Sequence, residues 1–269
     1  MTKEDIDGFI KEHGIKTILD LRTGMEAVEG LPIDKSFPTM TLENVRPKDL
    51  LVDSNDSGVH PEEAKTEVMD FLNNSTTLRK KFRIDFAGKN FQRYCVFMSC
   101  SFRLKITLLV LMLFCQKKKA SYLVGREVLS PMGVSKMYRK FAIYCQSEVR
   151  QALEIFTDPS NYPIHIHCTQ GKDRTGIMAC LLEHIAGVPK DIIIDDYAKT
   201  QQGLEPVRDM MLSEIRKAGL TEDFANAPPK NMEELLEYLN GKYGSVDGYL
   251  DAIGFGKQSR DKVRKIIAV

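Results

Sequence analysis

A cysteine and an arginine six positions apart stand in the most chemically suggestive segment of the chain, IHIHCTQGKDRTGIMAC. The β-branched residues before Cys168 predict a strand over residues 162–168, and the residues from Arg174 onward predict a helix that ends at Gly187. Cys168 then opens a loop whose backbone N–H groups, together with the amino end of the helix, form a binding site for an anion. Arg174 can donate two parallel hydrogen bonds to a phosphate.

The same positive field acts on the Cys168 thiol. Cysteines in comparable electropositive surroundings are mainly thiolates at neutral pH, and a thiolate beneath a bound phosphoryl group is a nucleophile in position. Gly171 and Gly176 allow tight turning and close approach of the backbone. The residue types therefore predict nucleophilic attack on phosphorus. The alternative, a buried and inert cysteine, does not account for the surrounding residues.

The decapeptide HCTQGKDRTG (residues 167–176) matches the HC-x5-R signature of cysteine-dependent protein tyrosine and dual-specificity phosphatases. Its HCxxGKDRTG form resembles the atypical tyrosine and phosphoinositide phosphatases of bacteria, fungi and protists. Further similarity lies in IKTILDLRTGMEAVEG (15–30), GVPKDIIIDDYAKT (187–200) and KYGSVDGYLDAIG (242–254). The resemblance extends over most of the chain and implies two-step hydrolysis of phosphate monoesters through a phosphocysteine, without metal or cofactor.

The resemblance also implies roles for the loop residues. Cys168 is the expected nucleophile, and Arg174 with the N–H groups of residues 169–174 is expected to hold the phosphoryl oxygens. His167 is expected to orient the loop. The expected substrate-binding residues are Thr169, Gln170, Gly171, Lys172 and Thr175. Among them, Lys172 is expected to add a second cation and Thr175 to donate a hydrogen bond to the thiolate. Asp20 and Arg22 are expected to be scaffold near the loop.

Asp173 is the expected general acid for the leaving group. Residues 128–138, where many cysteine phosphatases place this acid, contain none. Glu127 is the nearest acid to that stretch, and Asp158 lies in a predicted turn. The alternatives to Asp173 are Asp196, which the sequence more readily assigns to a structural role, and a solvent proton with a good leaving group.

The loop that begins at Cys168 needs a fold that holds it at the end of the strand predicted over residues 162–168. Strand and helix patterns alternate, which favours an α/β fold of the cysteine-phosphatase type with a central sheet flanked by helices on both faces. The pattern predicts helices over 4–13, 60–75 and 174–187, a helix pair or one long helix over 132–156, strands over 15–22, 81–88 and 162–168, and mostly loop over 23–60.

The most apolar stretch is residues 94–115, within an expected helical insertion over about 94–140. Its uninterrupted part, ITLLVLMLFC, has ten residues, about half of the roughly 20 needed to span a bilayer. A core or lid helix is the first interpretation. Because Lys117–Lys119 follow directly, the alternative is weak contact of residues 102–119 with anionic lipid at a membrane surface.

Composition bounds the remaining possibilities. The chain has 269 residues, 28% charged residues and a net charge of +1, which predicts one domain over residues 1–269 and excludes a histone-like nucleic-acid binder. The six cysteines contain no CxxC pair, which disfavours a zinc site or a disulfide framework. The first residues, MTKEDIDGFIKEHG, contain no apolar signal segment, so a cytoplasmic location is expected. Relative to the family, an N-terminal segment before the first strand is expected to be missing.

The expected activity is hydrolysis of phosphotyrosine, with phosphoserine and phosphothreonine as further substrates, and phosphoinositides are the alternative. The expected partners are therefore a phosphorylated protein or a phosphoinositide, and not a nucleic acid. Two rival classes differ from this. A sulfur transferase or arsenate reductase also uses a reactive cysteine, but the GKDRTG run argues against both. A pseudophosphatase that only binds phosphorylated ligands is disfavoured because Cys168 and Arg174 are both present.

Overall fold

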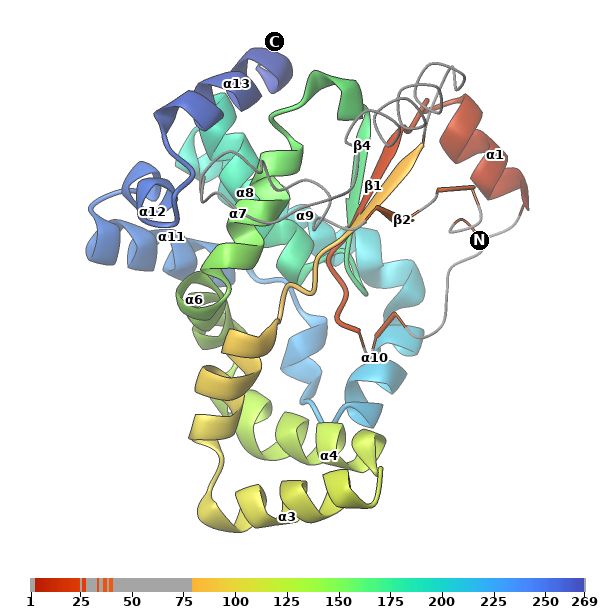
Figure 1. Cartoon of the computed structure of the whole chain (residues 1–269), viewed down its shortest axis with the longest axis vertical. Helices are drawn as coiled ribbons and strands as arrows, with labels where there is room; N and C mark the ends of the chain where they lie inside the picture. Colours follow the sequence, from red (N-terminus) through yellow and green to blue (C-terminus); the bar gives the residue numbers. More distant parts are fainter. Residues whose placement is uncertain are drawn as a thin grey trace, which may run out of the picture.

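The computed structural model describes residues 3–24, 26–27, 33, 36–37, 39–40 and 79–268. Within these ranges a four-stranded parallel sheet lies between helices (Figure 1), with the strand order β2–β3–β1–β4. The strands are β1 (Thr17–Asp20), β2 (Thr39–Met40), β3 (Lys80–Arg83) and β4 (Ile164–His167). The α/β fold class with a flanked central sheet is therefore confirmed.

The parallel register brings the carboxyl ends of three strands to one edge of the sheet. Leu19 of β1 stands beside Phe82 on one side and Ile166 on the other. One residue beyond β1, the Leu21 N–H donates to the His167 carbonyl at 2.9 Å. Segments that follow β1, β3 and β4 are thus gathered at one place, which is where ligands bind in open parallel sheets.

The two faces of the sheet are covered by different elements because successive strand residues point to opposite sides. Ile18 faces the helix α1 (Lys3–Lys11), whose Phe9 ring packs edge-on against His165 with centroids 4.7 Å apart. Leu19 is fully buried on the other face, in the main hydrophobic core. Helices α7 (Gln146–Ile155) and α8 (Asp173–Ala186) contribute to that core.

Helices make up most of the other residues that the structure describes. Before β4 they are the π-helices η3 (Phe91–Phe97) and η4 (Gly125–Leu129), the α-helices α3 (Phe102–Leu113), α4 (Lys117–Val124), α5 (Ser130–Met132) and α6 (Val134–Tyr144), and the 3₁₀ turn η5 (Pro159–Asn161). After α8 they are α9 (Lys190–Leu204), η6 (Glu205–Val207), α10 (Arg208–Lys217), η7 (Glu222–Ala225), α11 (Pro229–Tyr243), α12 (Val246–Ala252) and α13 (Lys257–Ile267).

Most predicted elements are found with shorter bounds. The segment 132–156 is a pair of helices, since Cys145 interrupts it, and the strands predicted over 15–22, 81–88 and 162–168 each hold four residues. Strand β2 was not expected, because its two residues lie in a stretch rich in turn-forming residues. The predicted helix over 60–75 and most of the predicted loop over 23–60 lie outside the described residues.

Helices α3 and α4 form a hairpin at the end of the molecule opposite α13 (Figure 1). The hairpin meets the body through glycines: a Cβ on Gly125 would lie 1.9 Å from the Ala218 carbonyl oxygen, and one on Gly219 would lie 2.2 Å from the Tyr122 oxygen. The Ser130 hydroxyl adds a hydrogen bond to the Gly219 carbonyl at 3.2 Å.

No helix within the described ranges is long and apolar enough to cross a bilayer.

Alanine at Gly125 should destabilise the protein. The added methyl group collides with the Ala218 carbonyl, and overpacking of this kind costs about 1–3 kcal/mol of unfolding free energy. Gly203 in α9 is the matched control, because a Cβ there meets nothing within 4 Å. Gly203→Ala should raise stability by about 0.5–1 kcal/mol. Urea denaturation measures both, and equal effects of the two substitutions would contradict the close contact.

Candidate active site

The loop between β4 and α8 presents unused backbone donors. The N–H groups of residues 169–172 donate to no acceptor in the part of the chain that the structure describes. Gly171 takes a φ of 69°, a left-handed conformation that turns the loop and favours glycine. The first helical bond runs from the Gly176 N–H to the Lys172 carbonyl at 3.0 Å. These donors and the amino end of α8 make the loop a cradle for an anion.

Cys168 follows β4 directly and enters this loop. The residue is buried, with 6% exposure. Its carbonyl accepts a hydrogen bond from the His167 ring at 3.1 Å, so Nδ1 must carry the proton. Burial lowers the pKa of His167 although Asp20 opposes this, which keeps the ring neutral at pH 7. The His167 ring is therefore held against the backbone at Cys168.

The Asp20 carboxylate, at the end of β1, holds Arg22 in place. This carboxylate is fully buried and accepts from Arg22 Nε at 2.9 Å and Nη2 at 2.8 Å, and Lys81 Nζ lies 3.2 Å away. Burial raises the pKa of Asp20, but the hydrogen bonds from Arg22 lower it more and hold it far below its usual range. Asp20 and Arg22 thus form a buried ion pair at the end of β1, as expected for scaffold.

Glu26 binds the guanidinium group of Arg174. Arg174 Nη1 donates to Glu26 Oε2 at 2.7 Å and Nη2 donates to Oε1 at 2.6 Å, which is a bidentate pair. The Thr169 hydroxyl also donates to Glu26, at 2.6 Å. Burial raises the pKa of Glu26, but the bonds from Arg174 and Thr169 outweigh it and lower the pKa to about 2. Glu26 is therefore ionised at neutral pH and holds Arg174 in place.

One edge of the Arg174 guanidinium remains for a ligand. Nη1 also donates to the Leu21 carbonyl at 3.1 Å, and Nη2 reaches the Thr169 hydroxyl at 3.2 Å. Nε makes no hydrogen bond with any described residue. An oxyanion that displaces the Thr169 hydroxyl can therefore accept from Nε and Nη2 together while Glu26 keeps the end of the fork.

Asp173 is anchored through one of its two oxygens. Oδ1 accepts from the Tyr138 hydroxyl and from Lys172 Nζ, each at 2.7 Å, while Oδ2 accepts no hydrogen bond from the described residues. Because Tyr138 gives its proton to Asp173, the Tyr197 hydroxyl, 2.8 Å away, must donate to Tyr138. Oδ2 is thus left without a hydrogen-bond partner among the described residues.

The remaining predicted binding residues are placed as follows. Lys172 is fully buried, and its ammonium contacts Asp173 and the Asn226 carbonyl, the latter at 3.2 Å, so its charge acts on Asp173. Thr169 and Gly171 are exposed and Gln170 is half-buried at the mouth of the loop. The Thr175 hydroxyl is buried and has no hydrogen-bond partner among the described residues, so it makes no bond to the thiol here.

Other candidates of the sequence lie in structural contacts. Asp158 caps η5 by accepting from the Ser160 N–H at 2.8 Å. Glu127 pairs with Arg126 on the exposed surface at 2.7 Å, and Asp196 pairs with Lys199 at 3.3 Å. A further cysteine outside these candidates, Cys180, lies within α8, where burial raises the pKa of its thiol far above its usual value and suits inert packing.

Sequence reasoning missed several residues of the site. Glu26 lies in the DLR segment that carries the resemblance, and Tyr197 follows Asp196 in the DDY run, so both had a local signal. Tyr138 had none. Asp85, just beyond β3, is a further carboxylate near the site: burial raises its pKa and the charge of Glu26 raises it further, against the lowering effect of Arg83.

Gly176 explains how Tyr197 reaches the site. A Cβ at Gly176 would lie 3.1 Å from the Tyr197 ring, which is tighter than an ordinary contact, so glycine lets the ring pack closely against α8. No group of three or more metal-ligating side chains occurs within the ranges that the structure describes.

Comparison with known proteins supports a specific family. A family model described as "Tyrosine phosphatase family" matches residues 1–268. A tyrosine-protein phosphatase of Nostoc commune is 29% identical over 143 residues, which is 50% of this chain and 49% of that protein. The triple specificity protein phosphatase PtpB of Mycobacterium tuberculosis is 23% identical over 120 residues, 39% of this chain and 44% of that protein.

A plant relative is similar over a shorter stretch. Inositol diphosphatase DSP1 of Oryza sativa is 28% identical over 87 residues, covering 32% of this chain and 39% of that protein. The chain thus spans about half the length, or less, of the curated relatives it matches. The family model, in contrast, covers nearly the entire sequence. The chain therefore belongs to the tyrosine phosphatase family.

Proposed function

We propose that this chain hydrolyses phosphate monoesters through a phosphocysteine at Cys168. The observation that carries the proposal is the cradle of unbonded loop N–H groups around Cys168, with the free Nε edge of Arg174 beside it. A phosphoryl group bound there places three oxygens against donors that strengthen as charge shifts in the transition state. The phosphatase domain takes up the whole of residues 1–269 in this proposal.

In the first step the Cys168 thiolate attacks phosphorus. The S–P bond forms as the bond to the leaving oxygen breaks, and Asp173 Oδ2 gives that oxygen its proton. The loop amides, including those of Thr169, Gln170, Gly171 and Lys172, hold the transferred phosphoryl oxygens. In the second step water attacks phosphorus and gives a proton to Asp173, and the S–P bond breaks. The unpartnered Thr175 hydroxyl would donate to the departing thiolate.

Phosphotyrosine is the first proposed substrate, with phosphoserine and phosphothreonine as further ones. Phosphoinositides are the second proposed class, since one relative is named an inositol diphosphatase and the head groups of phosphoinositides are phosphorylated inositols. A lipid substrate is presented at a membrane, and contact of residues 102–119 with lipid would bring the enzyme to it. The free state of all six cysteines fits a reducing, cytoplasmic location, where the Cys168 thiol would persist.

Cys168→Ser should abolish phosphate release. Removing the nucleophile should lower kcat/KM at least about a thousandfold, measured as malachite-green phosphate release from phosphotyrosine peptides, phosphothreonine peptides and phosphatidylinositol phosphates. The substrate with the highest wild-type kcat/KM identifies the class. Cys115→Ser, at an exposed cysteine, is the matched control and should leave the rates unchanged. Release by Cys168→Ser at the wild-type rate would overturn the proposal.

Asp173→Asn should affect poor leaving groups most. Since an alkyl alcohol needs a proton to depart, kcat/KM for a phosphoserine peptide should fall about 10²–10⁴-fold, while hydrolysis of 4-nitrophenyl phosphate should change little. Asp85→Asn tests the other carboxylate near the site and should leave the ratio of the two substrates at its wild-type value. If Asp85→Asn changes the ratio and Asp173→Asn does not, Asp85 is the acid.

Glu26→Gln should loosen Arg174. A neutral amide cannot accept both charge-assisted bonds, and misplacement of Arg174 should lower kcat/KM about a hundredfold. Stability should change with a defined sign. Because folding lowers the Glu26 pKa from 4.5 to about 2, its carboxylate stabilises the protein fully above pH 4.5, and this contribution is lost as pH falls toward 2.

Urea denaturation at several pH values checks the effect on stability. Glu26→Gln should lose less unfolding free energy than wild type between pH 4.5 and 2. Glu127→Gln removes a carboxylate from an exposed pair and should follow the wild-type curve. Parallel curves for wild type and Glu26→Gln would mean that Arg174 does not depend on Glu26.

A further inference from the structure

The outer face of α3 is apolar and bare. The inner face packs Leu104 and Leu108 into a small core with Cys100 and Val128. The opposite face follows a helical spacing of three and four residues and is exposed to between 46% and 79% at Phe102, Ile106, Leu109, Val110 and Leu113. Contiguous exposed apolar side chains of this kind mark a site that binds a partner or a membrane. The exposed apolar face of α3 therefore indicates that another molecule binds there.

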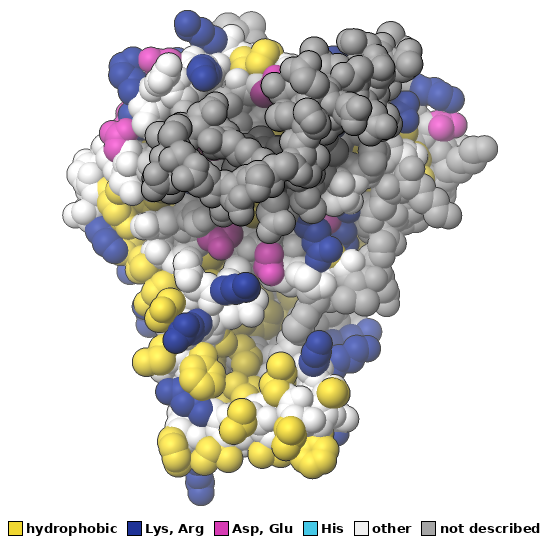
Figure 2. Space-filling view, viewed as in Figure 1, with side chains coloured by type: hydrophobic (Ala, Val, Ile, Leu, Met, Phe, Trp, Pro, Cys, Tyr) yellow, Lys and Arg dark blue, Asp and Glu magenta, His cyan; other side chains and the backbone are white. Residues whose placement is uncertain are grey.

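The charge around this face has one sign. Residues 89–126 contain no Asp or Glu and eight basic residues, which are Lys89, Arg93, Arg103, Lys105, Lys117, Lys118, Lys119 and Arg126. The whole chain, in contrast, is balanced, with 38 basic and 37 acidic residues. Figure 2 shows Lys and Arg side chains beside the hydrophobic ones at the α3–α4 end, with Asp and Glu only above it on the face in view.

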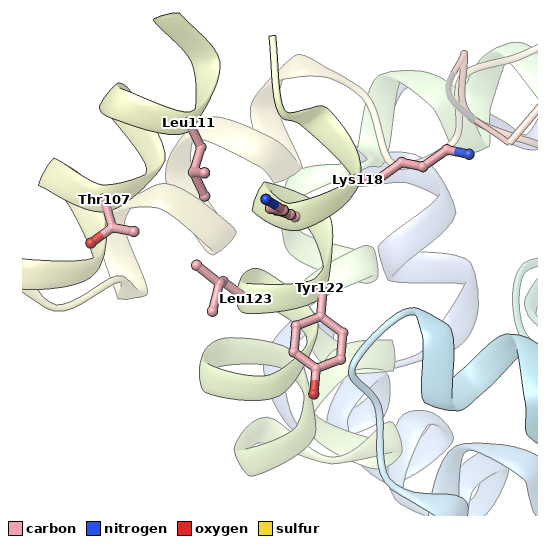
Figure 3. Close-up of a pocket in the computed structure, with 6 residues that line it drawn as sticks. Thr107, Leu111, Lys118, Tyr122 and Leu123 are labelled. Carbon is pink, nitrogen blue, oxygen red and sulfur yellow. The ribbon is translucent and has the colours of Figure 1, made fainter. Parts of the chain in front are cut away.

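A groove between α3 and α4 combines the same two chemistries. It has a volume of about 390 Å³ and is lined by Thr107, Leu111, Lys118, Lys119, Tyr122 and Leu123. Leu111 from α3 and Leu123 from α4 point toward the same gap (Figure 3). The Lys118 ammonium points away from this gap (Figure 3), so the groove itself is apolar and suits a hydrocarbon chain, with cations on the surface beside it.

The charge pattern distinguishes between occupants. A second copy of this chain, docked face to face, would place Lys117–Lys119 against the same three lysines, which is repulsive. An anionic bilayer supplies what this surface lacks: hydrocarbon for the apolar side chains and phosphates for the lysines. Each basic residue near such a surface strengthens binding about fivefold.

The position of the hairpin suits this occupant. Arg264 in α13 donates to the Ile185 carbonyl at 2.7 Å, so the carboxyl end of α8 lies beside α13. The amino end of α8, with the Cys168 loop, therefore points toward the opposite end of the molecule, where α3 and α4 lie (Figure 1). A surface bound by the hairpin would face the same end as the loop.

We propose that the α3–α4 hairpin is a docking surface for anionic lipid bilayers, in which the apolar face of α3 enters the bilayer and Lys117–Lys119 contact lipid phosphates. This inference does not depend on the catalytic proposal. It concerns a surface that contributes no residue to the Cys168 loop, and it holds equally for a protein substrate or a lipid substrate.

Vesicle flotation of the full chain tests the proposal. Wild type should bind vesicles of mixed phosphatidylcholine and phosphatidylserine and bind pure phosphatidylcholine far less. Replacing Lys117, Lys118 and Lys119 by Ala should weaken binding to the mixed vesicles about a hundredfold. Phe102→Ser and Leu113→Ser, which remove the most exposed apolar side chains of α3, should each weaken it about tenfold or more.

A matched triple variant separates the surface from net charge. Lys190, Lys230 and Lys257 are exposed at the starts of three other helices, and replacing them by Ala removes the same charge and should leave vesicle binding unchanged. Equal loss in both triple variants would overturn the proposal. So would failure of wild type to bind the mixed vesicles, or a dimer in size-exclusion chromatography that Leu113→Ser dissociates without any vesicle binding.

Two further measurements keep this proposal apart from the catalytic one. The Lys117–Lys119 variant should hydrolyse soluble 4-nitrophenyl phosphate at the wild-type rate. Cys168→Ser should bind mixed vesicles as wild type does. Loss of vesicle binding in Cys168→Ser would contradict a docking surface that is separate from the loop.

Discussion

The ion pair between Arg174 and Glu26 is the interaction on which the site depends. It joins the loop after β1 to the amino end of α8 across 148 residues of sequence. A buried guanidinium is tolerable only when its charge is paired and its donors are used, and Glu26, Leu21 and Thr169 use all of them except Nε. The Arg174 side chain, which would contact substrate, is therefore already oriented. Its side-chain entropy is lost when the protein folds and not when substrate binds.

A second polar cluster connects Asp173, at the end of the Cys168 loop, to helices α6 and α9 through hydrogen bonds. Tyr197 of α9 and Tyr138 of α6 pass hydrogen bonds in one direction to Asp173, and the buried ammonium of Lys172 ends on the same oxygen. Burial raises the pKa of both tyrosines, so each hydroxyl keeps its proton and remains a donor. Asp173 is thus positioned by tyrosines from two helices and by the loop residue Lys172, and the direction of these bonds leaves its second oxygen available.

The sequence predicts the secondary structure that neighbouring residues determine, but it does not predict contacts between residues that are far apart in the chain. Strand, loop and helix around Cys168 follow from contiguous residues, because the β-branched run, Gly171 and the Gly187 terminus each act locally. Glu26 and Tyr138 could not be assigned to the site from spacing, since only the assembled sheet and α6 bring them there. The apolar run over α3 predicts a core or lid helix or, alternatively, contact with lipid, and the sequence cannot decide between them, because a hydrophobic pattern does not state what covers the outer face.

The hairpin has a hydrophobic core of its own. Cys100, Leu104 and Val128 form a cluster separate from the main core, and partly buried Met132 touches both. Cooperative units of folding follow such boundaries. The packing of the hairpin therefore rests on a few buried side chains of its own and on Met132. Because its outward apolar residues belong to neither core, substitutions there can change what the surface binds while the sheet and the Cys168 loop stay folded.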